Sequence, residues 1–141
     1  PIRAVFSTDF TRVDGRGFVF HPTLTIKKED LQKNLNLIFR IGSIFATERI
    51  MDYFYEVGSN NVTANRSMFD ANEGYLESHL DLACSYRLNE RWLLFGGLQT
   101  NFYKGTTNYA SPLLKTPNTT SIAIGFAWTF YKSKERAGQW L

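Results

Sequence analysis

Large apolar residues occupy every second position of one segment near the C-terminal end of the chain. Residues 121–130 read SIAIGFAWTF, and their apolar members are Ile122, Ile124, Phe126, Trp128 and Phe130. The intervening positions hold the small, uncharged residues Ser121, Ala123, Gly125, Ala127 and Thr129. Because successive side chains of a β-strand point to opposite faces, the alternation predicts a strand with one large apolar face and one small face.

Five further segments alternate in a similar way, at residues 2–10, 18–26, 35–41, 75–88 and 92–103. They raise the expected total to about six strands of roughly ten residues each. In the 75–88 segment the expected apolar face holds Leu76, Leu80, Leu82, Cys84, Tyr86 and Leu88. The opposite face holds Tyr75, Glu77, His79, Asp81, Ser85 and Arg87. Pro22 predicts an edge strand or a local irregularity, because proline cannot donate a hydrogen bond to a neighbouring strand.

The links between these segments fall into short and long ones. TRVDGRG (11–17) contains an Asp-Gly turn, KKEDLQKN (27–34) interrupts the alternation, and NER (89–91) is a tight turn. Within residues 44–74, ATERIMDYFYEV predicts a short helix or a bent strand, and a long polar loop follows. Residues 105–118 form a second long loop. The two long links would lie at one end of the strands, opposite the links at 27–34 and 89–91.

These features predict an all-β fold, an antiparallel up-and-down (meander) transmembrane β-barrel. A tilted strand of about 9–11 residues crosses a bilayer. Short turns at one rim and longer loops at the other are typical of outer-membrane barrels. Such a barrel needs at least about eight strands, so these six are expected to be part of a larger barrel, and the chain is expected to be a piece of a longer one.

A soluble, lipocalin-like ligand-binding barrel is the alternative. In such a barrel the large residues face inward and the outward face is rich in charged residues. The small face of residues 121–130 instead suits a crowded lumen. The large face, with Trp128 and Phe130 at its end, suits lipid and an interfacial aromatic girdle. We therefore expect outer-membrane lipid to contact the apolar face of this strand.

The amino-acid composition excludes several classes of site and partner. Cys84 is the only cysteine, which excludes a disulfide within the chain and a zinc cluster of cysteines. His21 and His79 lie far apart in sequence without ligand-like spacing, so neither a metal nor a cofactor is expected. The net charge of +3 comes from scattered basic residues, and a nucleic-acid partner is not expected. No stretch approaches 18 consecutive apolar residues, which excludes a transmembrane helix but not a membrane-spanning barrel.

Polar residues on the inward faces of two strands form the candidate lumen set of Glu77, His79, Asp81, Arg87, Gln99 and Asn101. A packed network of hydrogen bonds and ion pairs is the favoured interpretation, because small barrels are filled by side chains. A polar pore lining, hence a small porin or channel, is the alternative. An acid–base cluster of Glu77, His79 and Asp81 would require a nucleophile in a recognisable context. Ser85 is only a neighbour on the same face, so we do not expect an enzyme.

Four motifs in a fixed order resemble the MipA/OmpV family of Gram-negative outer-membrane proteins. The resemblance rests on a tyrosine-rich motif, a hairpin around a tryptophan, a Ser-Pro-Leu motif and a last strand that ends in phenylalanine. The matching residues are Tyr53, Phe54, Tyr55, Val57, Trp92, Ser111, Pro112, Leu113 and Phe130. Glu56 replaces the usual glycine of the first motif. Ala123 replaces the polar residue of the family's C-terminal insertion signal.

The resemblance implies a location in the outer membrane and a non-enzymatic role. The expected role is a scaffold that holds a lytic transglycosylase near a murein synthase, or a surface-interaction protein, since some relatives are adhesins. It also implies that residues 122–130 form the insertion strand of the barrel. Residues 1–131 would be the C-terminal part of the barrel, and residues 132–141 a basic tail.

Overall fold

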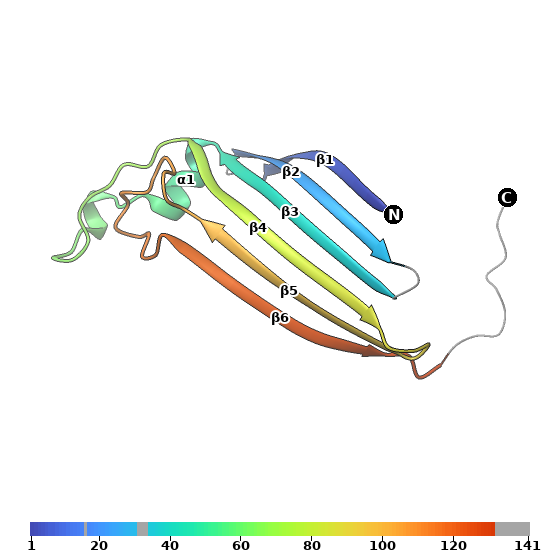
Figure 1. The fold of residues 1–141 in the computed structure, drawn as a ribbon. Coiled ribbons are helices and arrows are strands. Elements are labelled where there is room, and N and C mark those ends of the chain that lie inside the picture. The colour runs from blue at the N-terminus through green and yellow to red at the C-terminus, as the bar shows by residue number, and fades with distance from the viewer. Residues whose placement is uncertain (16, 31–33, 132–141) are drawn as a thin grey trace.

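The computed structural model describes residues 1–15, 17–30 and 34–131, and six strands within them form one antiparallel sheet (Figure 1). The strands are β1 (Ile2–Val13), β2 (Gly17–Asp30), β3 (Leu35–Ala46), β4 (Gly74–Arg87), β5 (Trp92–Phe102) and β6 (Asn118–Trp128). Each pairs with its neighbour in the chain, which confirms the predicted meander. β1 and β6 are the two edges, so the sheet is open within the described residues. The expected basic tail at 132–141 lies outside them.

The strands extend further than the alternation predicted. Residues 27–30 were expected to interrupt β2, but they continue it and pair with residues 35–38 of β3. The expectation was wrong because the partner strand satisfies the backbone of this charged segment whatever its side chains are. β6 ends at Trp128, so Phe130, the expected last residue of the strand, lies beyond its end.

Pro22 lies in an interior strand, so the prediction of an edge strand is wrong. The β2–β3 register passes from Phe20 opposite Phe45 to Thr23 opposite Gly42 and leaves out His21 and Pro22. Proline has no backbone N–H to offer a neighbour, and the ladder toward β3 is interrupted there. The predicted local irregularity is thus confirmed.

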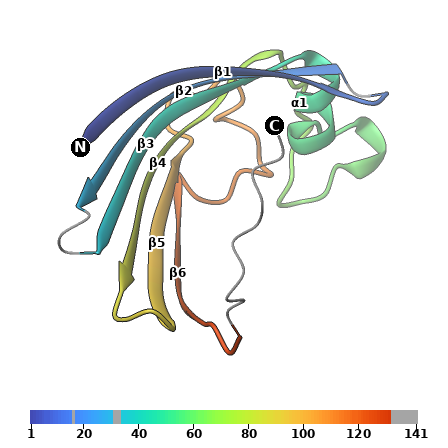
Figure 2. The same cartoon turned by 90° about the vertical axis from the view of Figure 1, so that its right-hand side faces the viewer.

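The strand registers give the sheet one mainly apolar face and one mainly polar face. The apolar face carries Ile2, Phe6, Phe10, Phe20, Leu24, Ile26, Phe39, Ile41, Leu82, Leu94, Leu98, Ile122, Ile124, Phe126 and Trp128. The polar face carries Arg3, Ser7, Asp9, His21, Thr23, Asn36, Arg40, Glu77, His79, Asp81, Gln99, Asn101 and Ser121. The sheet is strongly curved, and α1 lies on its concave side (Figure 2).

A β-bulge reverses two side chains near the start of β4. The β3–β4 register shifts between Ile44 and Phe45, so that Ile44 pairs with Glu77 but Phe45 pairs with Tyr75. The rings of Phe45 and Tyr75 are in contact, with centroids 5.7 Å apart, while Leu76 packs against the core under α1. The predicted faces of Tyr75 and Leu76 are therefore wrong, because an inserted residue breaks the period of two.

The core sits at the end of the sheet where both long links gather (Figure 1). The first link contains α1 (Glu48–Tyr55) and the 3₁₀ turn η1 (Ser59–Asn61), and α1 confirms the helical alternative. The buried residues of the cluster are Ala46, Ile50, Met51, Tyr55 and Ala71. Val13, Val19, Phe69, Leu76 and Leu114 pack around them. No helix among the described residues is long and apolar enough to cross a membrane.

Candidate functional site

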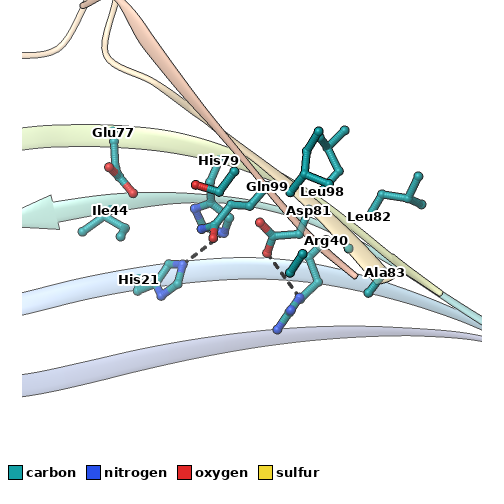
Figure 3. A pocket seen from close by; sticks show the side chains of 14 residues that line it. His21, Arg40, Ile44, Glu77, His79, Asp81, Leu82, Ala83, Leu98 and Gln99 are labelled. Carbon is teal, nitrogen blue, oxygen red and sulfur yellow. Dashed lines mark hydrogen bonds and ion pairs between the residues drawn. The ribbon is translucent and has the colours of Figure 1, made fainter. Parts of the chain in front are cut away.

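A pocket of about 470 Å³ opens on the polar face across β2 to β6 (Figure 3). Its polar lining consists of His21, Arg40, Glu77, His79, Asp81, Gln99 and Ser121. Small residues of the same face, Ala83, Gly97 and Ala123, leave the space open. The large apolar side chains of the opposite face are exposed, Ile124 at 88% among them.

Two histidines from different strands face each other in this pocket. The Nε2 atoms of His21 and His79 are 3.3 Å apart, and the two rings are edge to face with centroids 4.8 Å apart. The Oγ1 atom of Thr23 lies 3.1 Å from the same nitrogen of His21. His79 is only 5% exposed. The contact therefore joins a buried imidazole to one that is half-buried.

The histidines meet across an intervening strand because that strand carries a glycine. His21 is on β2, His79 is on β4, and Gly42 of β3 pairs directly with His79. A Cβ atom on Gly42 would lie 2.6 Å from Cε1 and 2.7 Å from Nε2 of His79. The imidazole thus occupies the space that any other residue at position 42 would fill. His21 reaches this space from β2, beside the gap in the β2–β3 ladder at Pro22.

An ion pair and two unpaired oxygens complete the polar set. Nε of Arg40 lies 3.3 Å from Oδ2 of Asp81. The other carboxylate oxygen of Asp81 and Oδ1 of Asn101 are buried without a hydrogen-bond partner among the described residues. Buried polar atoms are normally paired, so each of these acceptors suits a donor or a cation. Asn101 is the direct β4–β5 neighbour of His79.

The structure gathers part of the predicted lumen set and adds residues to it. Glu77, His79, Asp81 and Gln99 line the pocket, and Asn101 lies next to His79. Arg87 lies exposed at the end of β4 and does not line it. Sequence reasoning missed His21 and Arg40 as members of the site. Pro22 and Gly42 were the available signals, since both mark a break in regular strand packing.

The tyrosine-rich and Ser-Pro motifs meet at the long-link end of the sheet. Tyr55 and Val57 are buried, and the hydroxyl of Ser111 donates a hydrogen bond of 2.7 Å to the carbonyl oxygen of Tyr55. Burial, with Tyr103 and Glu77 nearby, raises the pKa of Tyr55 to about 12. Tyr53 and Phe54 are exposed on α1. Glu56 has φ −69° and needs no glycine.

A second tie holds the two long links together. The backbone N–H of Asn72 donates to Oδ1 of Asn108 over 2.9 Å. Nδ2 of Asn108 donates back to the carbonyl oxygen of Asn72 over 2.8 Å. Asn108 is 1% exposed. The links are therefore packed together and anchored by buried polar groups.

Aromatic side chains collect at the opposite end of the apolar face. The ring centroids of Trp92 and Trp128 are 6.2 Å apart, and those of Trp128 and Phe130 are 6.3 Å apart. Phe126 lies 5.6 Å from Trp92 by the same measure. The expected insertion strand thus ends in an aromatic cluster beside the 88–91 turn.

The described residues contain no group of three or more His, Cys, Asp or Glu side chains placed to hold a metal ion. The chain matches the family model described as MltA-interacting protein MipA over residues 3–130. No curated protein and no solved structure matches the chain.

Proposed function

Because the chain belongs to the MipA family, we propose that it spans the outer membrane of a Gram-negative bacterium and serves there as a scaffold. Proteins of this family are outer-membrane barrels linked to murein enzyme complexes, and the family is a non-enzymatic scaffold family. The proposed partners are a lytic transglycosylase of the MltA kind, which the family description names, and a murein synthase. Neither nucleic acid nor a cofactor is part of the proposal.

The observation that carries the membrane part is the continuous apolar face. Ile122 and Ile124 are 72% and 88% exposed, and Phe126 is 66% exposed. The pocket lies on the opposite, polar face. A lipocalin-like barrel would have these faces reversed, with large apolar residues inside. The arrangement supports lipid contact by Ile122, Ile124, Phe126 and Trp128, with Phe130 at the interface.

The two edges of the sheet support a larger barrel. Unpaired backbone groups are costly in lipid, so only closed barrels and helices span membranes. β1 and β6 are not paired with each other. The open edges therefore support a larger barrel in which further strands pair with both of them.

The direction of the sheet follows from its links. In outer-membrane barrels the short turns face the periplasm and the longer loops face outward. The turn at 88–91 would then face the periplasm, where the murein lies, while α1 and the two long links would face the exterior. We assign the scaffold contact to the short-turn rim. The exposed Tyr53 and Phe54 on α1 favour an additional surface contact outside the cell.

Co-purification from crosslinked membranes tests the scaffold role. The wild-type chain should enrich a lytic transglycosylase and a murein synthase, and Arg91→Glu at the short-turn rim should reduce their recovery. Lys104→Glu, an equal charge reversal at the opposite rim, is the matched control and should leave recovery unchanged. Recovery of neither enzyme above background from the wild type would refute the scaffold role.

The polar pocket favours a channel as the second candidate function. The pocket of about 470 Å³ lies on the polar face, and in a completed barrel this face would line the lumen with polar side chains. Planar-bilayer recordings distinguish an open channel from a barrel that does not conduct. Discrete conductance steps would support a channel, and a silent bilayer containing folded protein would eliminate it.

A further inference from the structure

We propose that the hydrogen bond between His21 and His79 is an acid-sensitive latch of the sheet, closed at neutral pH and released when both rings carry a proton. Their Nε2 atoms are 3.3 Å apart (Figure 3). The sequence contains no other histidine, so no other histidine side chain can produce the same response. The latch would act in the same way whether the protein is a scaffold or a channel.

The latch lies where backbone pairing between two strands is interrupted. The β2–β3 register leaves out His21 and Pro22, and Pro22 has no backbone N–H with which to pair. A side-chain contact bridges this gap, because His21 reaches from β2 across β3 to His79 on β4. Loss of the contact would therefore remove a link between strands at a point where the ladder is already weak.

The number of protons on the two rings decides whether the latch can form. A hydrogen bond between imidazole nitrogens needs one N–H donor and one nitrogen without a proton as acceptor. A proton on each ring leaves no acceptor and places two positive charges a hydrogen-bond length apart. Separated histidines each gain a proton near pH 6.5. Below this pH the opened state binds more protons than the latched state, so acid favours opening.

Charged side chains from three strands surround the two histidines. They are Asp9 of β1, Arg40 of β3, and Glu77 and Asp81 of β4, while the facing residues of β5 and β6 are the uncharged Gln99, Asn101 and Ser121. The carboxylates favour the first proton, with which the hydrogen bond can still form. They supply no acceptor nitrogen between the rings, so the second proton still breaks the contact.

His21 is the ring that would move. His79 is only 5% exposed and occupies the space above Gly42, where a Cβ would lie 2.6 Å from its Cε1 atom. His21 is half-buried and lines the open pocket. Oγ1 of Thr23, 3.1 Å from Nε2 of His21, offers the protonated ring another acceptor. Acid would thus release His21 from β4 and let the backbone around Pro22 open more often.

Hydrogen exchange followed by mass spectrometry tests the latch on the protein purified from outer membranes in detergent. Exchange is corrected for the pH dependence of the chemical step and compared between about pH 7.5 and about pH 5. In the wild type, peptides covering residues 18–26 should open more often in acid, by up to about tenfold per pH unit for one additional proton. Peptides from β6 are the internal reference and should not change.

His21→Gln removes one titrating ring and keeps a side chain that can hydrogen-bond to His79. Because the glutamine amide holds both a donor and an acceptor, it can pair with either protonation state of His79. This variant should stay closed at about pH 5. Ser43→Ala is the matched control, since Oγ of Ser43 lies 2.7 Å from Oγ of Ser78 across β3 and β4 and neither group titrates. It should keep the acid response of the wild type.

Three results would overturn the proposal. They are unchanged exchange of residues 18–26 in the folded wild type on acidification, the same increase in His21→Gln as in the wild type, and loss of the acid response in Ser43→Ala.

Discussion

At the scale of single residues, glycine determines which side chains meet on the polar face. Gly42 leaves room for the ring of His79, so His21 can reach it across a whole strand. Gly125 plays the same part on β6, because a Cβ there would lie 2.7 Å from the ring of its cross-strand partner Phe95. The one large aromatic residue in the middle of β5 on this face is thereby accommodated. On the polar face of the sheet, the two glycines therefore determine where the large side chains can lie.

Replacing Gly42 by alanine should destabilise the protein through overpacking. The new Cβ would lie 2.6 Å from Cε1 of His79 and 2.9 Å from the carbonyl oxygen of Pro22, and the latter is backbone that cannot rotate away. We expect a loss of about 1–3 kcal/mol in the free energy of unfolding, measured by urea titration in lipid vesicles. Gly97→Ala is the control, since its nearest atom, the carbonyl oxygen of Leu82, is 3.4 Å away. An equal loss in both variants would contradict this account of Gly42.

The sequence predicts this site only in part. A period of two is a local property, so it places Glu77, His79 and Asp81 on one face without knowledge of the fold. The contact between His21 and His79 depends on two registers, β2 with β3 and β3 with β4, and these are set by pairing along whole strands. The Arg40–Asp81 ion pair depends on the second of these registers. No local pattern carries that information.

At the scale of elements, the two long links form a packed unit. Residues 105–118 and the part of the first link after Val57 were expected to be loops, and residues 46–57 a short helix or a bent strand, yet Met51, Val57 and Asn108 are nearly inaccessible to solvent. Their burial arises where the 47–73 and 103–117 segments meet, and each segment covers the other. The sequence offered a short helix as one of two alternatives near Tyr53, but a core built from two distant links has no periodicity of its own. Only the bulge in β4 brings Leu76 into this core.

Asn108→Ala should loosen the two links from each other. The substitution removes both hydrogen bonds to Asn72 and leaves the backbone groups of that residue without their partner. We expect the free energy of unfolding to fall by about 1–3 kcal/mol. Proteolytic cleavage should become faster in the long links than in the strands. Limited proteolysis followed by mass spectrometry locates the cuts. Asn60→Ala, on the exposed 3₁₀ turn, is the control and should be cleaved at the same rate as the wild type. Cleavage of Asn108→Ala at the wild-type rate would show that the hydrogen bonds between Asn72 and Asn108 are dispensable.

At the scale of the whole molecule, the two faces of one curved sheet meet different surroundings. The alternation predicted which residues share a face, and the registers extend those faces over all six strands. The sequence also predicted a sheet too small to close. The predicted barrel implies a curved sheet, but no sequence pattern indicated that α1 would lie on its concave side (Figure 2). Curvature arises from twist and from the bulge, and neither is written in the period of two.

Two neighbouring residues of β6 test whether the apolar face contacts lipid. Ile124 pairs with Gly96 and is on the apolar face, while Ala123 pairs with Gly97 and lines the polar pocket at almost the same depth. Ile124→Lys should cost about 2–4 kcal/mol if it lies near the bilayer midplane, because the charge would be placed in hydrocarbon. Ala123→Lys should cost much less, because its side chain enters a polar space. Urea unfolding in lipid vesicles measures both, and fractionation of cells gives the share of each variant in the outer membrane. An equal loss of unfolding free energy in both variants, or a larger loss for Ala123→Lys, would mean that the apolar face does not contact lipid. Such a result would favour the lipocalin-like alternative.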